Sequence, residues 1–236
     1  MGAPRECFLK EAEMATPSPI PSPTPEQPVR LVPPVEAPTT GPLAGDPAMV
    51  GFPSFVVGAI TIGMVLIGVV PATPFGPVAG AAMPIVLTAA AGMFLATIWA
   101  ARIGHNAAAG ISGIVGSFYL SYALLVLGLT HNWFGIALTQ MANTQRIFVI
   151  AWIAIVSMLL LATLRLPMIW TLLFAVVDAA LILNLLGIVQ NSANMYKAAG
   201  WVLMAVSAIV VYLFFGTASH ATGGKELPLG PPILHA

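Results

Sequence analysis

The stretch TLLFAVVDAALILNLLGIV, residues 171–189, is almost wholly apolar and carries one charged side chain, Asp178, near its middle. It is about as long as the roughly 20 residues that an α-helix needs to cross the hydrocarbon core of a bilayer. A backbone in lipid must satisfy its own hydrogen bonds, which a helix does within one segment. The stretch therefore predicts a transmembrane helix with an acidic group inside it.

The composition of the whole chain agrees with that prediction. Of its 236 residues, 58% are hydrophobic and 7% are charged, whereas soluble domains have roughly 25% charged residues. The formal net charge is zero, and without a run of basic residues we expect no binding to nucleic acid. The class indicated is an integral membrane protein.

Apolar runs of similar length recur from residue 46 onward. They lie at 50–72, 79–102, 107–130, 146–166, 168–188 and 197–217. Each is long enough for one crossing. We therefore predict an all-α integral membrane protein whose six transmembrane helices form a domain over residues 46–217.

Polar tails flank the predicted membrane domain. Residues 1–45 are rich in Pro, Ser and Thr and are expected to be disordered with local polyproline II structure. This tail is either a solubilising segment or a docking site for an SH3-like partner. Its first residues lack the apolar core of a signal peptide. Residues 218–236 form the predicted C-terminal tail.

The basic residues indicate how the chain crosses the membrane. With six spans both tails lie on one side, together with Arg30, Arg102, Arg165 and Lys225, while Arg146 and Lys197 lie opposite. The side with more Lys and Arg is usually cytoplasmic. We expect a multi-pass protein of the plasma (inner) membrane with both termini in the cytoplasm.

Charge and reactive groups within the predicted spans restrict the function. Away from their ends they contain no Lys or Arg, so a carboxylate could not be matched there by a fixed positive ring. A weak acid carried with its proton, or a neutral solute, is favoured. The sequence has no Walker A motif and no nucleophile beside a base, so enzyme activity is not expected. Scattered histidines and a lone Cys7 predict no metal site or cofactor.

Four stretches resemble one known family. They are DPAMVGF (46–52), RIGHNAAAGISGIVGSFYLSY (102–122), AAGWVLMAVSAIVVYLFFG (198–216) and KELPLG (225–230). They are similar, in this order, to four parts of the acetate uptake transporters, the YaaH-type succinate–acetate permeases. These parts are the signature before the first helix, the second loop with the third helix, the last helix, and the C-terminal motif. The resemblance covers about residues 46–230.

The resemblance implies a fold, an activity and a constriction. The family forms a six-helix protomer, assembled as a hexamer with a pore in each protomer, and takes up acetate and sometimes succinate with protons. Its pore narrows at Phe, Tyr and Leu side chains, whose positions fall on Phe55, Val115 and Val177. Two of the three are smaller here and lack a hydroxyl, which implies a wider or drier pore with altered cargo.

The same resemblance suggests further site residues. The signature before the first span falls on Asp46, Pro47, Ala48 and Gly51. The loop between the second and third spans contributes His105 and Asn106, and the spans contribute Tyr119 and Tyr212. Asp46 could equally cap the first helix. The loop pair and the tyrosines are candidates for the pore, for packing or for an interface between subunits.

Asp178 allows two interpretations. An acid inside a span normally faces the protein interior or a water path, and without a nearby cation its protonated form is favoured. It is either a proton relay coupled to the cargo or a buried acid hydrogen-bonded to a neighbouring helix. If Val177 faces the pore, Asp178 points about 100° away around the helix.

Three functions are consistent with these features. The first is proton-coupled transport of acetate or related short monocarboxylates, and also of the dicarboxylate succinate. The second is a passive channel for small neutral solutes such as urea or amides. The third is a membrane partner that transports nothing and recruits another protein through its Pro-rich tail.

Overall fold

The computed structural model describes residues 45–69, 77–225 and 227–234. Within these ranges the helices are α1 (Ala48–Ile67), α2 (Pro77–Arg102), α3 (Asn106–Thr130), α4 (Leu138–Ala162), the short 3-10 helix η1 (Thr163–Arg165), α5 (Met168–Gln190) and α6 (Ala193–Ala221). Six of the described helices are long and apolar enough to cross a membrane. The predicted all-α, six-span membrane fold is thus confirmed. The predicted tail lies outside the described residues, apart from Gly45.

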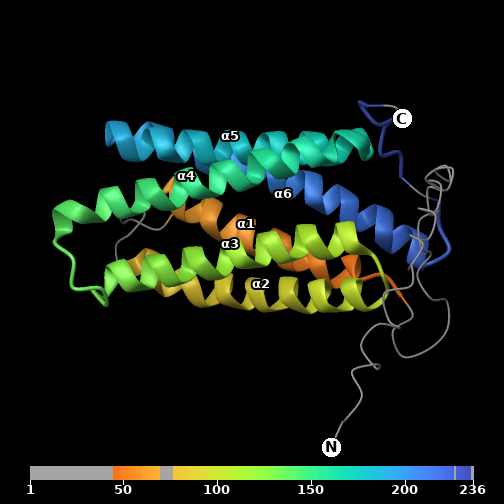
Figure 1. The fold of residues 1–236 in the computed structure, drawn as a ribbon, viewed down its shortest axis with the longest axis horizontal. Helices are drawn as coiled ribbons and strands as arrows, with labels where there is room; N and C mark the ends of the chain where they lie inside the picture. Colours follow the sequence, from red (N-terminus) through yellow and green to blue (C-terminus); the bar gives the residue numbers. More distant parts are fainter. Residues whose placement is uncertain (1–44, 70–76, 226, 235–236) are drawn as a thin grey trace, which may run out of the picture. The chain divides into compact units, whose positions relative to one another are not determined.

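The helices run alternately up and down through the bundle (Figure 1). α1 packs on α2 and α6, α2 packs on α3, and α5 packs on α4 and α6. The start of α1 and the end of α6 lie at one end of the bundle, which we call the near end. The loop between α3 and α4 lies at the other, far end. α3 and α4 make few contacts with each other, and the cavity described below lies where these two helices approach α1 and α5.

Small residues bring neighbouring helices close together. A Cβ atom added to Gly200 of α6 would lie 2.7 Å from the carbonyl oxygen of Gly63 in α1. Gly113 and Gly116 of α3 face α2. A Cβ added to Gly113 would lie 3.3 Å from Thr97, and one added to Gly116 would lie 3.1 Å from the Cβ of Met93. This is the close backbone approach that small residues allow between membrane helices, so Gly113 and Gly116 serve packing against α2.

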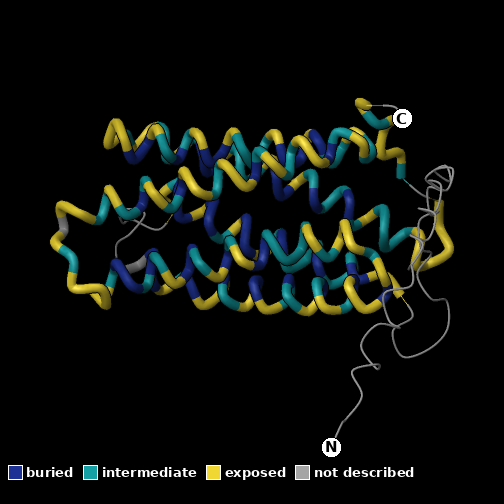
Figure 2. The backbone as a smooth tube through the Cα atoms, in the orientation of Figure 1, coloured by how far each residue is buried: buried dark blue, intermediate teal, exposed yellow. Residues whose placement is uncertain are grey.

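Large apolar side chains remain on the outside of the bundle. Leu95, Met158 and Leu161 are each more than half exposed, and Figure 2 shows exposed residues along the outer faces of the helices while buried ones face inward. In water this pattern would be unfavourable, but lipid or another subunit can cover it.

The start of α4 differs from the prediction. The helix begins at Leu138, well before the expected start at residue 146. Its polar first turns are held by local bonds, including Asn143 Nδ2 to Gln140 Oε1 at 3.2 Å. Arg146 consequently lies about two turns inside α4. The helix therefore extends beyond the apolar run, because apolar length marks where side chains become lipid-like and not where the helix begins.

The two ends of the membrane domain also differ in detail. α1 ends at Ile67 because Gly68 adopts a left-handed conformation with φ of 85°, which glycine takes without strain. α6 continues to Ala221. Beyond it the chain returns to the bundle, and the Ile169 N–H donates a 3.2 Å hydrogen bond to the carbonyl of Leu229. Described residues of the C-terminal segment are therefore packed against the start of α5.

Candidate functional site

A hollow of about 230 Å³ opens at the near end of the bundle; we call it the vestibule. The signature residues at the start of α1 line it, joined by side chains from α2, α3, α5 and α6. Its lining includes Asp46, Pro47, Ala48, Gly51, Phe52, Phe55, Ile111, Ser112, Trp170 and Thr217. The structure thus brings the four signature positions together at one opening.

Asp46 has a clear local role at this opening. Its Oδ1 accepts a 2.8 Å hydrogen bond from the backbone N–H of Ala48. A carboxylate at this place satisfies a donor at the helix start and complements the positive end of the helix dipole. The N-cap residue itself is Pro47, so Asp46 binds the first helical N–H from one position before the cap, and its carboxylate gives the vestibule a negative rim.

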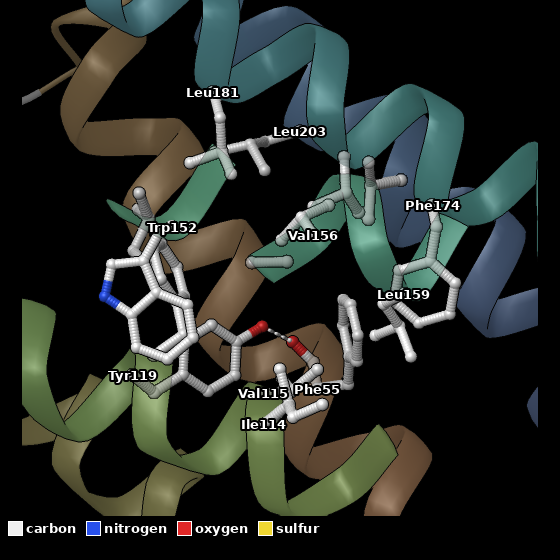
Figure 3. Close-up of a pocket in the computed structure, with 15 residues that line it drawn as sticks. Phe55, Ile114, Val115, Tyr119, Trp152, Val156, Leu159, Phe174, Leu181 and Leu203 are labelled. Atoms are coloured by element: carbon white, nitrogen blue, oxygen red, sulfur yellow. Dashed lines mark hydrogen bonds between the residues drawn. The ribbon is translucent and has the colours of Figure 1, made fainter. Parts of the chain in front are cut away.

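A second, smaller cavity of about 40 Å³ lies deeper in the bundle; we call it the central cavity. Five helices line it with aliphatic and aromatic side chains (Figure 3). They are Phe55, Ala59, Ile62, Ile114, Val115, Phe118, Tyr119, Trp152, Val156, Leu159, Phe174, Val177, Leu181, Leu203 and Val206. Phe55, Val115 and Val177, which lie far apart in the sequence, meet at this cavity. Tyr119 joins them.

Phe55 is the side chain common to both hollows. It is buried, and its ring meets that of Tyr119 edge-on with centroids 6.1 Å apart. The Tyr119 hydroxyl donates a 2.7 Å hydrogen bond to the backbone carbonyl of Phe55 (Figure 3). Phe55 therefore stands between the vestibule and the central cavity, with its backbone fixed from α3.

Asp178 lies beside the cavity-lining face of α5 and is outside the lining of both hollows described here. Its Oδ2 accepts a 2.8 Å hydrogen bond from the hydroxyl of Ser157 in α4. Its Oδ1 is buried and has no hydrogen-bond partner in the described part of the chain. This arrangement favours the interpretation of Asp178 as a buried acid that links two helices.

Three other predicted residues lie away from the described hollows. His105 and Asn106 form the start of α3, with His105 at the N-cap position. The Tyr212 hydroxyl donates a 2.9 Å hydrogen bond to the carbonyl of Pro228. In this protomer Tyr212 thus holds the C-terminal segment against α6.

Several aromatic lining residues were missed by sequence reasoning. Phe118, Trp152 and Phe174 line the central cavity, and Trp170 lines the vestibule. In an apolar run, an aromatic side chain that faces a cavity has the same local sequence signal as one that faces lipid. The available signal was helical spacing, since Val177 and Leu181 are one turn apart and share a face.

The electrostatic character of the two hollows is simple. Among the described lining residues Asp46 is the one ionisable carboxylate, and no Lys or Arg is present. The described residues also contain no group of three or more His, Cys, Asp or Glu side chains that could hold a metal ion. The site can accommodate small uncharged or weakly polar molecules.

Comparison with known proteins gives matches to a family model and to solved structures. Residues 30–224 match the model of the GPR1/FUN34/yaaH family. A solved structure described as that of the bacterial acetate channel SatP matches with a TM-score of 0.67 and 18% sequence identity, over 79% of this chain and 99% of that chain. No curated protein sequence matches the chain. At this identity the structural match shows a shared fold.

Proposed function

The chain belongs to the GPR1/FUN34/yaaH family, as the sequence resemblance predicted, and we propose that it carries acetate or a related short monocarboxylate through the central cavity as the neutral acid. The observation that carries the proposal is the serial arrangement of a vestibule and an apolar cavity on either side of Phe55. A solved structure with the same fold is described as an acetate channel.

The lining of the central cavity decides which form of the acid can pass. Transfer of an unpaired carboxylate from water into a dry, apolar interior costs on the order of tens of kcal/mol. The described lining offers neither a cation nor a free hydroxyl, because the Tyr119 hydroxyl is bound to the carbonyl of Phe55. The neutral acid avoids most of this cost and brings its own proton. Coupling to protons then follows without a dedicated relay.

The size of the cavity favours small acids. One water-sized sphere needs roughly 10–15 Å³, so the 40 Å³ of the central cavity holds about three such spheres. Acetic acid, with four non-hydrogen atoms, fits after a small displacement of Phe55. Succinic acid is twice as large and must lose two charges, so we expect it to pass more slowly than acetate or propionate.

Phe55 supplies a gate between the two hollows. Its backbone is held by Tyr119, while its side chain can change rotamer to connect them. Val115 and Val177 complete the narrow part of the proposed path from α3 and α5. Their small size leaves Phe55 as the main barrier.

A membrane placement and an assembly follow from the charged and apolar surfaces. Arg102 ends α2, Arg165 ends η1 and Lys225 follows α6, all at the near end, whereas Arg146 and Lys197 lie in the far-end turns of α4 and α6. By the positive-inside rule the near end faces the cytoplasm of a plasma membrane. The exposed apolar side chains would be covered by lipid and, in a homo-hexamer, by neighbouring subunits.

A channel for neutral solutes is the second candidate, because a cavity without lining cations would also admit urea or an amide. Purified protein in vesicles separates the two functions. We expect labelled acetate to enter faster than in protein-free vesicles when the lumen is alkaline, with inhibition by propionate, weaker inhibition by succinate and none by urea. Urea entry that is faster than acetate entry and indifferent to the pH gradient would establish the second function. A chain that moves neither solute would be the non-transporting partner.

A further inference from the structure

Unsatisfied polar atoms gather on the far side of the central cavity. The hydroxyl of Tyr122, Nε of Arg146 and Oδ1 of Asn184 are buried and have no hydrogen-bond partner among the described residues. Tyr122 and Asn184 are themselves almost fully buried. Such groups are rare in folded proteins because each costs about 1–3 kcal/mol. Three of them on three helices indicate a site that something else satisfies.

These groups continue the faces that line the central cavity. Tyr122 lies one turn beyond Tyr119, about 4.5 Å farther along α3, and Asn184 lies one turn beyond Leu181 on α5. The ring of Tyr122 stacks on Phe118, which lines the cavity, with centroids 5.9 Å apart. The polar atoms therefore lie on the extension of the proposed path toward the far end.

Tyr196 of α6 connects the group. It packs against the buried cluster that contains Tyr122. The ring of Tyr122 also meets that of Phe148 in α4, two residues from Arg146, with centroids 6.1 Å apart. Its ring packs against Gly187, one turn beyond Asn184, where an added Cβ would lie 3.0 Å away. Side chains from α3, α4, α5 and α6 thus surround one location.

The charge of Arg146 has no protein counter-ion there. The acidic side chains that the structure describes are Asp46 and Asp178. Asp46 accepts a hydrogen bond from Ala48 at the start of α1, at the near end, and Asp178 accepts a hydrogen bond from Ser157. A buried guanidinium N–H without a partner is costly, and an anion or water would compensate it. An anion that arrives along the path would do so.

We propose that Arg146, Tyr122 and Asn184 form a binding site for the carboxylate of a short monocarboxylate anion at the far end of the path. The guanidinium presents N–H groups in the planar fork that suits a carboxylate, and the Tyr122 hydroxyl donates a further bond. The Asn184 amide supplies its NH₂ group after rotation about its last bond. This inference rests on the proposed function and adds a place where the cargo is held in its charged form.

The site explains how an apolar cavity obtains its cargo. Carboxylic acids with an ordinary pKa, roughly 4–5, are almost fully ionised at neutral pH. A cationic site beyond the cavity holds the abundant anion, which then takes a proton from hydronium, leaving water, before it enters the apolar cavity. The aromatic side chains Phe118 and Trp152, with centroids 5.2 Å apart, lie between that site and the cavity interior.

Binding and transport together test this site. The probe is sodium acetate, with acetamide as its neutral isostere, added to the full chain in lipid nanodiscs and followed by saturation-transfer NMR of the ligand methyl group. Arg146→Gln and Tyr122→Phe are compared with Lys197→Gln, which removes an exposed charge near the same end. We expect Arg146→Gln to weaken acetate binding about tenfold or more, to leave acetamide binding unchanged, and to raise the half-saturating acetate concentration for vesicle uptake.

The outcomes separate the site from the transport function. Tyr122→Phe should weaken acetate binding by a smaller factor and keep the fold, because its hydroxyl has no hydrogen-bond partner to lose among the described residues. Acetate binding that is equal in wild type, Arg146→Gln and Tyr122→Phe overturns the site, and wild-type uptake would still support transport. Wild-type binding without uptake keeps the site and refutes the proposed function. If Arg146→Gln fails to fold, Tyr122→Phe alone decides, and unchanged affinity in that variant overturns the proposal.

Discussion

Tyr119 of α3 holds Phe55 of α1 through a 2.7 Å hydrogen bond from its hydroxyl to the Phe55 carbonyl, across 64 residues of sequence. The bond lies where the vestibule meets the central cavity. The Tyr119 ring also lies directly over Gly58, where a Cβ atom would collide with it. The position of the proposed gate is therefore set by the contact between two helices.

That contact predicts an unusual cost for one small substitution. Gly58→Ala should destabilise the protein by about 1–3 kcal/mol, because the added methyl displaces the Tyr119 ring from a packed interior. Gly110→Ala is the matched control, since a Cβ there meets nothing within 4 Å and alanine favours helix by up to about 1 kcal/mol. Thermal unfolding of the purified variants, followed by circular dichroism, measures both changes. Similar melting temperatures for the two variants would contradict the packing described here.

Removal of the Phe55 ring should open the path. Phe55→Ala joins the vestibule to the central cavity, so we expect faster entry of acetate together with a new leak of urea or glycerol. Phe52→Ala is the control, because Phe52 lines the vestibule but not the central cavity. Its ring packs on Trp170 with centroids 5.9 Å apart. Stopped-flow light scattering of vesicles reports the leak. Equal leakage in the two variants would mean that Phe55 is not the barrier.

A larger side chain at Val177 should close the central cavity. Phenylalanine has four more carbon atoms than valine, and the cavity volume is about 40 Å³. We expect Val177→Phe to lower protein-dependent acetate uptake about tenfold or more while the protein still folds. Ile182→Phe, on an exposed part of α5, should leave uptake close to wild type. Full uptake through Val177→Phe would place the path elsewhere.

Asp178 can be tested apart from the path. If it serves to link α5 to α4, Asp178→Asn keeps a partner for Ser157, so uptake and its pH dependence should stay close to wild type. Ser157→Ala should cost about 1–2 kcal/mol of stability because it leaves Oδ2 without its donor. Uptake rates between pH 5 and 8 provide the measurement. Loss of the pH dependence in Asp178→Asn would instead identify Asp178 as the proton relay.

The sequence was informative where one physical rule dominates. Apolar length predicted six crossings because lipid requires long, internally bonded helices. The resemblance nominated Phe55, Val115 and Val177, and the fold brings all three to one cavity. Single hydropathy runs could not reveal that contact, because a valine that faces a cavity and one that faces lipid look alike in sequence.

The far end shows the opposite case. Arg146 marked the edge of an apolar run, which hid its place two turns inside α4. Tyr122 and Asn184 appear in sequence as isolated polar residues in separate spans. Their common burial without partners depends on how α3, α4 and α5 pack, and local sequence carries no record of that packing.

The central claim is that the acid crosses the apolar cavity without its charge. Labelled acetate entry and lumenal pH should be recorded in the same vesicles, with a trapped pH-sensitive dye and with protein-free and Val177→Phe vesicles as background. The account predicts that each protein-dependent increment of acetate entry acidifies the lumen and leaves the membrane potential unchanged. Protein-dependent acetate entry that builds a potential and leaves the lumenal pH constant would contradict it.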